Sequence, residues 1–227
     1  MPIQFKPLLA GAHLPDRLLA CLGAVAGIAL TILACAALPL GMADLPNIVA
    51  PLGASAVLVF AVPASPLAQP WPVIGGNTIS AVVGVTAFRL VSDPVVAAGL
   101  AVGGAILVMS LLRCLHPPGG AAALTAVIGS EGIHKAGYWF ALAPLAVNSV
   151  TLVLAAVLFH RLTRRSYPHR PAPLPQQAEP SGLNLADIDA ALAEMHESFD
   201  IAREDLDALL SRAELHAVER RRQSTGQ

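Results

Sequence analysis

Apolar residues occur along this chain in long, nearly uninterrupted runs. A helix that crosses a membrane needs about 20 apolar residues, and four runs reach this length: residues 18–40, 73–91, 95–115 and 138–160. Two further runs, residues 51–62 and 118–128, hold about a dozen residues each, or roughly 18 Å of helix. Both open on proline and small residues. The pattern predicts an all-α membrane protein with two short, broken helices among the long ones.

The two short runs are similar to each other. PLGASAVL at residues 51–58 aligns with PPGGAAAL at residues 117–124, at an offset of 66 residues. The same offset places the first long run over the third and the second over the fourth. We therefore expect a polytopic membrane helix bundle of two pseudo-repeats, each with a long helix, a short broken helix and a long helix. Short segments interrupted by Gly and Pro at matching places of two halves point to a transporter's binding site. Chance similarity between segments rich in Gly and Ala is the alternative.

Basic residues near the ends of the spans indicate the orientation. They are Lys6 and Arg17 before the first span, and Arg161, Arg164, Arg165 and Arg170 after the last. Both termini should therefore be cytoplasmic, which requires an even number of crossings. If the short runs cross the membrane, there are six spans and the repeats are inverted. If the short runs re-enter, there are four spans and the repeats are parallel, and the sequence leaves both arrangements open.

The charged residues are few and unevenly placed. Apolar residues make up 55% of the chain and charged residues 13%, against about 25% in an ordinary globular domain. Most of the charge follows residue 160. Prolines without periodicity mark a linker, and helical periodicity then returns. We therefore expect a transmembrane domain (1–166), a Pro-rich linker (167–182), a soluble, cytoplasmic helical hairpin as the tail (183–222) and a disordered C-terminus (223–227).

The stretch RCLHPPGG, residues 113–120, places charge and helix-breaking residues between apolar runs. Pro117 and Pro118 cannot donate a hydrogen bond, so one helix should end before them and another begin at Pro118. Gly119 and Gly120 leave the first turn of that helix almost bare. We expect its free N–H groups to face outward, because a helix N-terminus carries partial positive charge and binds anions.

The first repeat contains the same arrangement in Pro51, Gly53 and Ser55, whose hydroxyl could donate to a ligand. Arg113 and His116 would add positive charge, and an ionisable group inside a membrane domain is a functional hypothesis by default. Each residue also has a structural explanation. The histidine could be neutral and bonded to a backbone carbonyl, the arginine could reach the membrane interface, and the glycines could allow close helix packing.

Polar residues also lie within the long runs, and they serve either as interhelical hydrogen bonds or as pore lining: Asn77, Thr78, Ser80, Asn148, Ser149 and Thr151. The candidate substrate-binding residues are Arg113, His116, Pro117, Pro118, Gly119, Gly120, Pro51, Gly53, Ser55 and Asn77. Cys114 and His116 could form half of a metal site, but no further ligands stand at suitable spacing. We expect neither a metal nor a cofactor. No catalytic motif stands in the spans, so we do not expect an enzyme.

HPPGGAAAL (116–124), preceded by Arg113 and paired with PLGASAVLVF (51–60) and QPWPVIGGN (69–77), resembles the HPP family of integral membrane proteins. The resemblance covers roughly residues 15–162. It implies a four-spanning transporter, and cyanobacterial and plastid relatives are associated with nitrite transport. Some longer relatives continue into a pair of CBS domains, and the tail of this chain looks like the helical segment that leads into that module.

We therefore expect a multi-pass protein of the bacterial cytoplasmic (inner) membrane that transports a small inorganic anion, as a carrier or a channel. Nitrite is the leading candidate. The expected partners are the anion, the lipid bilayer and a second copy of this small domain in a homodimer, with no nucleic acid. The alternative is a membrane-anchored sensor or scaffold whose cytoplasmic helical tail mediates assembly or regulation.

Overall fold

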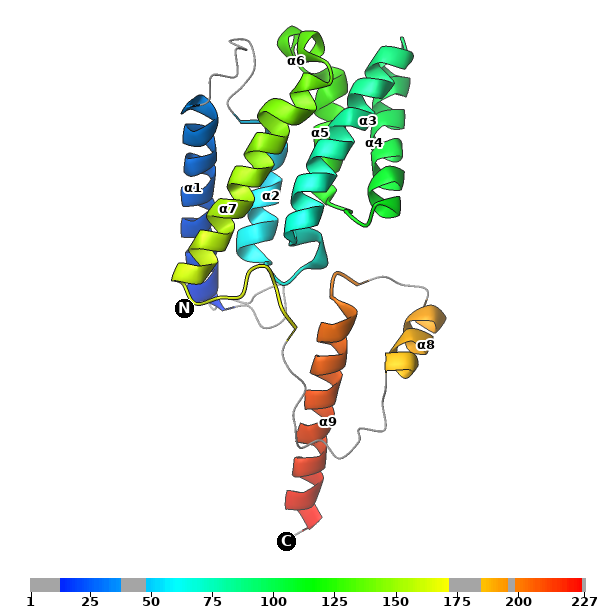
Figure 1. The fold of residues 1–227 in the computed structure, drawn as a ribbon. Helices are drawn as coiled ribbons and strands as arrows, with labels where there is room; N and C mark the ends of the chain where they lie inside the picture. The colour runs from blue at the N-terminus through cyan, green and yellow to red at the C-terminus, as the bar shows by residue number, and fades with distance from the viewer. Residues whose placement is uncertain (1–12, 38–47, 172–184, 196–198, 226–227) are drawn as a thin grey trace, which may run out of the picture. The chain divides into compact units, whose positions relative to one another are not determined.

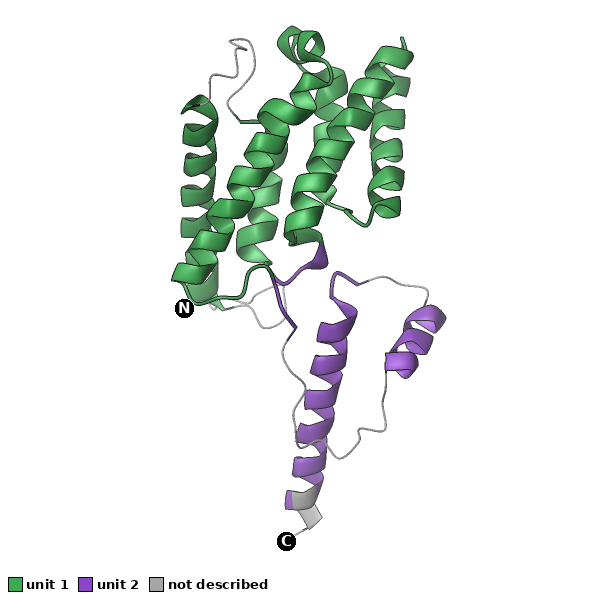
Figure 2. Cartoon of the chain, viewed as in Figure 1, with its two compact units in different colours: residues 1–63, 67–168 green, residues 64–66, 169–227 purple. Residues whose placement is uncertain are grey.

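The computed structural model describes residues 13–37, 48–171, 185–195 and 199–225, and every regular element within these ranges is helical. The chain forms two compact units (Figure 2). Unit 1 comprises Met1–Pro63 and Leu67–Pro168, and unit 2 comprises Ala64–Pro66 and His169–Gln227. The all-helical class expected from the hydropathy pattern is confirmed.

Unit 1 is built from long helices and shorter ones (Figure 1). In chain order the helices are α1 (Leu14–Ala37), α2 (Pro51–Ala61), the short η1 (Pro66–Ala68, whose first residue belongs to unit 2), η2 (Pro72–Gly76) leading into α3 (Asn77–Leu90), α4 (Pro94–Leu111), α5 (Pro117–Ile128), α6 (Glu131–Ala136) and η3 (Ala141–Ala146) leading into α7 (Val147–Leu162). Four stretches in the described part of the chain are long and apolar enough to cross a membrane: Leu14–Ala37, Pro72–Leu90, Pro94–Leu111 and Ala141–Leu162. These are the four predicted long helices, and α2 and α5 are the two predicted short ones.

The start of α1 lies beside the ends of α2 and α7. The guanidinium of Arg17 donates to the carbonyl of Ala61, the last residue of α2, over 2.9 Å. The carboxylate of Asp16 accepts a hydrogen bond from Arg165, three residues beyond the end of α7. Helix α1 is therefore antiparallel to both α2 and α7, and the first and last helices of unit 1 have their outer ends on the same side of the bundle.

Helix α3 is antiparallel to α7 and α4 and parallel to α5. Asn77 at the start of α3 donates to Ser149 (3.2 Å), whereas Thr86 near its end bonds to Tyr138, which precedes α7 (3.1 Å). Gly76 and Val83 lie close to Met109 and Gly104, so the order of contacts is reversed along α4. Ser80 and Gly84 lie close to Gly119 and Ala123, so the order is the same along α5.

The direction of the helices therefore alternates along the chain: α1, α3 and α5 run one way, and α2, α4 and α7 run the other (Figure 1). The triplet α1–α2–α3 is inverted relative to α4–α5–α7. The packing has the same symmetry, since α1 packs on α2 and α7, α4 packs on α5 and α3, and α2 contacts α5. The two-repeat layout is thus present. The chain passes along the bundle six times, because the short helices add two passes to the four spans that the family resemblance implied.

Helices α4 and α7 end in the same motif, on the same side of the bundle. Arg113 (φ 54°) and Arg164 (φ 57°) follow them in the left-handed conformation. The next N–H then donates to the carbonyl five residues back, Cys114 to Met109 over 2.9 Å and Arg165 to His160 over 2.8 Å. This Schellman arrangement satisfies the last carbonyls of each helix.

Unit 2 contains α8 (Leu185–Met195) and α9 (Arg203–Thr225), the two helices of the predicted hairpin. Arg203 at the start of α9 pairs with Asp189 of α8. Unit 1 continues to Pro168, because the buried ring of Tyr167 packs beside His160 and its hydroxyl donates to the Ala68 carbonyl over 2.8 Å. Helix α9 enters the segment 223–227 that was expected to be disordered. Most of the predicted linker (residues 172–182) lies outside the described residues.

Candidate functional site

Four polar side chains meet inside unit 1. Nε2 of His116 lies 2.8 Å from Oγ of Ser55, and Nδ2 of Asn77 donates to the same oxygen over 3.1 Å. Nδ2 of Asn77 also donates to Oγ of Ser149 over 3.2 Å. All four side chains are fully buried, with 0% exposure. We call Ser55, Asn77, His116 and Ser149 the polar cluster; they come from α2, α3, the residue before α5, and α7.

Both ring nitrogens of His116 have a partner. Nδ1 lies 2.8 Å from the carbonyl oxygen of Leu67. A carbonyl only accepts, so Nδ1 carries a hydrogen and donates it. In the neutral ring, Nε2 is therefore an acceptor, and the hydroxyl of Ser55 is its donor. The structural explanation, a neutral histidine bonded to a backbone carbonyl, accounts for Nδ1, whereas Nε2 bonds to a side chain of the other repeat.

The backbone around His116 explains how the ring reaches Ser55. His116 is extended (φ −142°, ψ 107°), as expected for a residue before proline. Gly76 packs directly against it, because a Cβ at Gly76 would lie 2.5 Å from Cβ of His116 and 2.7 Å from the Cys114 carbonyl oxygen. Gly119 allows a second close approach, since its Cβ would lie 2.7 Å from Oγ of Ser80. Gly119 therefore serves helix packing.

At the starts of the short helices, three of the first-turn N–H groups have backbone partners, those of Leu52, Gly53 and Gly119. Pro117 and Pro118 have no N–H, and the N–H of Gly119 donates to the His116 carbonyl over 2.8 Å. At the start of α2, Leu52 donates to Val49 and Gly53 to Ala50, each over 3.0 Å. The residues before each helix turn back and accept these bonds. The helix dipoles remain, and their positive ends lie within about one turn of the cluster.

The other predicted residues occupy varied places. Pro51 belongs to the site through its backbone, since its carbonyl lies 3.3 Å from Oγ of Ser55. Arg113 is exposed beyond the end of α4. Gly53 is exposed and faces open space, and Gly120 has only ordinary contact with Val102. Pro118 is buried and Pro117 exposed. The structure thus brings Ser55, Asn77 and His116 together and leaves Arg113 outside their hydrogen bonds.

Two features of the cluster lie beyond the candidate substrate-binding residues. NTIS (77–80) and NSVT (148–151) are similar polar strings, and each begins at or beside the start of its helix, after η2 or η3. The two strings are 71 residues apart, whereas the repeats align at an offset of 66 residues. The repeat alignment therefore does not pair Asn77 with Asn148, and it does not identify Ser149 as a partner of Asn77. Ser80, one turn beyond Asn77, is also fully buried, and its hydroxyl has no hydrogen-bond partner among the residues described.

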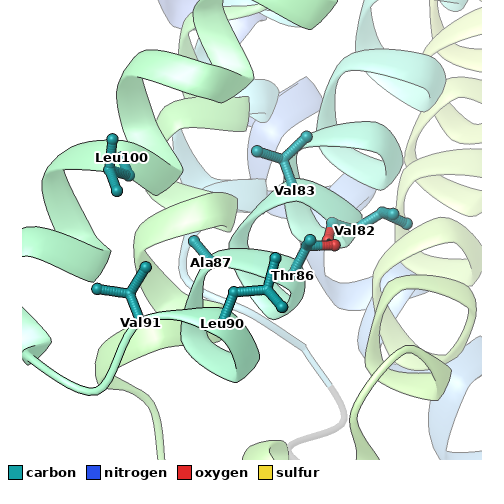
Figure 3. Close-up of a pocket in the computed structure, with 7 residues that line it drawn as sticks. All are labelled: Val82, Val83, Thr86, Ala87, Leu90, Val91 and Leu100. Atoms are coloured by element: carbon teal, nitrogen blue, oxygen red, sulfur yellow. The ribbon is translucent and has the colours of Figure 1, made fainter.

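An apolar groove on the α3–α4 surface is chemically different from the cluster (Figure 3). It is lined by Val82, Val83, Thr86, Ala87, Leu90, Val91 and Leu100. Its polar lining residue, Thr86, donates to the Val82 carbonyl and bonds to the Tyr138 hydroxyl. The groove therefore presents no unused polar group to an anion. Within the described ranges, no three His, Cys, Asp or Glu side chains gather to hold a metal ion.

Two inverted three-helix repeats of apolar helices around a buried polar cluster define a multi-pass helical membrane protein. The family model described as "HPP, transmembrane region" matches residues 10–168, and the chain belongs to this family. The matched segment ends where unit 1 ends.

Two transmembrane proteins of Dictyostelium discoideum are similar to this chain. One is 40% identical over 131 residues, covering 56% of this chain and 46% of the relative. The other is 41% identical over 120 residues, covering 51% and 38%. The chain therefore spans less than half the length of these relatives. No solved structure matches it.

Proposed function

We propose that this protein is a membrane transporter or channel for a small inorganic anion, which binds at the polar cluster. The observation that carries the proposal is the 2.8 Å bond between Ser55 and His116. It joins the two short helices of inverted repeats, and transporters built from such repeats bind their substrates where broken helices meet.

The electrostatics of the cluster favour an anion. The positive dipole ends of α2 and α5 lie beside it. Hydroxyl and amide donors surround it, and the hydroxyl of Ser80 is unused among the residues described. No carboxylate occurs in the sequences of α2, α3, α4, α5 or α7. A small anion can therefore replace internal hydrogen bonds without meeting a like charge.

Nitrite is our leading candidate substrate. It is a bent monovalent anion whose oxygens accept hydrogen bonds, which suits closely spaced hydroxyl and amide donors. The family resemblance favours the same ion. Because the four cluster side chains are fully buried, the structure is closed around the site, and an ion needs an opening movement to reach it. We expect small ions such as nitrite, nitrate and formate to compete for this site.

The distribution of arginines supports an orientation. Arg17, Arg113, Arg161, Arg164 and Arg165 lie at the end of the bundle where α1 begins and α7 ends. Arg89 and Lys135 lie toward the opposite end, near Asp93 and Glu131 in the sequence. By the positive-inside rule we place the arginine-rich end in the cytoplasm, in a bacterial inner membrane. The homodimer stays a prediction based on the small size of the domain.

Anion flux into proteoliposomes tests the proposal. We expect the protein to carry nitrite above the rate of protein-free vesicles, and Asn77→Ala to reduce this flux at least tenfold, because both Ser55 and Ser149 lose their donor. Ser110→Ala is the matched control, since the hydroxyl of this exposed serine donates to the Ile106 carbonyl of its own helix. If none of nitrite, nitrate, formate and chloride is carried faster than by empty vesicles, the proposal is wrong.

A sensor or scaffold is the second candidate, because unit 2 is a separate compact unit beyond the family match. Unit 2 has polar contacts of its own: Arg203 pairs with Asp189, and Nε2 of His169 lies 2.9 Å from Oδ2 of Asp205. In a scaffold, deletion of residues 169–227 abolishes function and His116→Ala is silent. In a transporter, the deletion leaves flux in proteoliposomes and His116→Ala removes it.

A further inference from the structure

The hydroxyl of Ser55 has two acceptors within reach. Nε2 of His116 lies 2.8 Å from its oxygen, and the Pro51 carbonyl lies 3.3 Å away. A hydroxyl has one hydrogen, so it donates to one of them at a time. The Ser55 oxygen also accepts a hydrogen from Nδ2 of Asn77.

This arrangement satisfies both protonation states of His116. In the neutral ring, Ser55 donates to Nε2. When Nε2 carries a proton, it donates to Oγ of Ser55, and the serine hydrogen turns to the Pro51 carbonyl. The serine oxygen then accepts from both His116 and Asn77 and uses both of its lone pairs. Nδ1 keeps its bond to Leu67 in both states. The site can therefore gain a proton without moving a heavy atom.

We propose that His116 binds a proton at Nε2 together with the anion, so that the protein carries one proton with each monovalent anion. The inference rests on the proposed anion transport. A hydronium ion on one side of the membrane gives its proton to Nε2, the anion binds as counterion, and both leave on the other side. The N–H bond breaks there as water takes the proton, and nothing is oxidised or reduced.

The surroundings of His116 make the anion its natural counterion. Helices α2, α4 and α5 and the η2 segment contain no charged residue. Helix α3 contributes Arg89 in its last turn, and α7 contributes His160 and Arg161 in its last turn. The buried thiol of Cys114 lies two residues away in the sequence. A buried charge needs a partner, and none of these groups supplies a negative one at neutral pH. Binding of the proton and binding of the anion therefore favour each other.

The experiment measures uptake into proteoliposomes of the full chain with the membrane voltage held at zero by valinomycin and equal potassium. Nitrate is the main probe, because its acid form is too scarce to leak across the bilayer, and nitrite is the second. With the outside one pH unit more acidic, one-to-one coupling predicts accumulation of the anion toward tenfold, since one pH unit is a tenfold difference in proton activity. An internal pH dye should report one proton entering per anion.

Two variants address the roles of His116 and Ser55. His116→Gln keeps polar atoms near Ser55 but binds no proton, so the accumulation driven by the pH gradient should disappear. Ser55→Ala leaves the protonated Nε2 without an acceptor and should reduce gradient-driven uptake at least tenfold, whereas Ser55→Thr keeps the hydroxyl and should restore it. Size-exclusion profiles confirm that each variant is folded.

The outcomes separate this inference from the proposed function. Gradient-driven uptake that requires His116 supports both. Anion flux at zero voltage that ignores the pH gradient, with His116→Gln at the wild-type rate, overturns the proton coupling and leaves anion transport standing. The absence of any anion flux overturns the proposed function and the coupling with it.

Discussion

Ser55 and His116 are 61 residues apart in the chain, yet their side chains share a hydrogen bond of 2.8 Å in the interior of unit 1. Ser55 belongs to the short helix of the first repeat, and His116 immediately precedes the short helix of the second. The bond is therefore a contact between the repeats. A relative movement of the two repeats that opens the site would have to break or replace it, and this couples occupancy of the site to the conformation of the bundle.

Gly76→Ala tests how closely η2 packs against His116. The added Cβ would lie 2.5 Å from Cβ of His116, so the backbone must shift, and we expect the free energy of unfolding to fall by about 1–3 kcal/mol. The control is Gly103→Ala, because nothing lies within 4 Å of its Cβ position and alanine favours helix. Thermal unfolding in detergent compares the two variants. Equal stability of both would contradict the close packing at Gly76.

Labelling of introduced cysteines tests the six-pass topology. In a variant without the three native cysteines, cysteine at Ser92 or Ser130 should react with an impermeant reagent from one side of the membrane. Cysteine at Leu112 or Ser166 should react from the other, because these four exposed positions follow helices of opposite direction. A re-entrant α5 would instead place Ser130 on the same side as Leu112. The labelling pattern therefore distinguishes inverted from parallel repeats.

The sequence predicts the helices and the repeat but not the contacts between them. Hydropathy is the same whichever way a helix runs. The directions of α2 and α5 therefore follow from tertiary contacts, such as the hydrogen bond between Arg17 and the Ala61 carbonyl. The sequence predicts Ser55, Asn77 and His116 as site residues because polar groups are costly among apolar residues. The partners of the first-turn N–H groups could not be predicted, because they depend on how the chain turns before each helix. The charge of Arg113 makes it a candidate from the sequence, whereas its left-handed conformation after α4 is a tertiary feature.

Arg113→Gly separates the charge of this residue from its role in ending α4. Glycine adopts the left-handed conformation of Arg113 without strain, so this variant should be more stable to unfolding than Arg113→Ala by about 1 kcal/mol. Because Arg113 is exposed, we expect it to attract anions toward the bundle rather than to bind them at the cluster. Arg113→Gly should raise KM a few-fold at low ionic strength, and less at high salt, with Vmax unchanged. A rise in KM of the same size at low and at high salt would place Arg113 at the bound anion.

Ser149→Ala tests whether the second repeat contributes to the cluster through α7. Nδ2 of Asn77 would lose an acceptor in a fully buried place, and an unsatisfied buried donor costs about 1–3 kcal/mol. We expect a loss of stability in this range and a fall in anion flux of about fivefold or more, because Asn77 would no longer be held in place against Ser55. Thr151→Ala is the matched control two residues further along α7, where the hydroxyl bonds to the Val147 carbonyl of its own helix over 2.9 Å. Flux and thermal unfolding are measured on both variants in the same lipid. If Ser149→Ala and Thr151→Ala behave alike in both measurements, the bond between Asn77 and Ser149 does not support the site, and the cluster reduces to Ser55, Asn77 and His116.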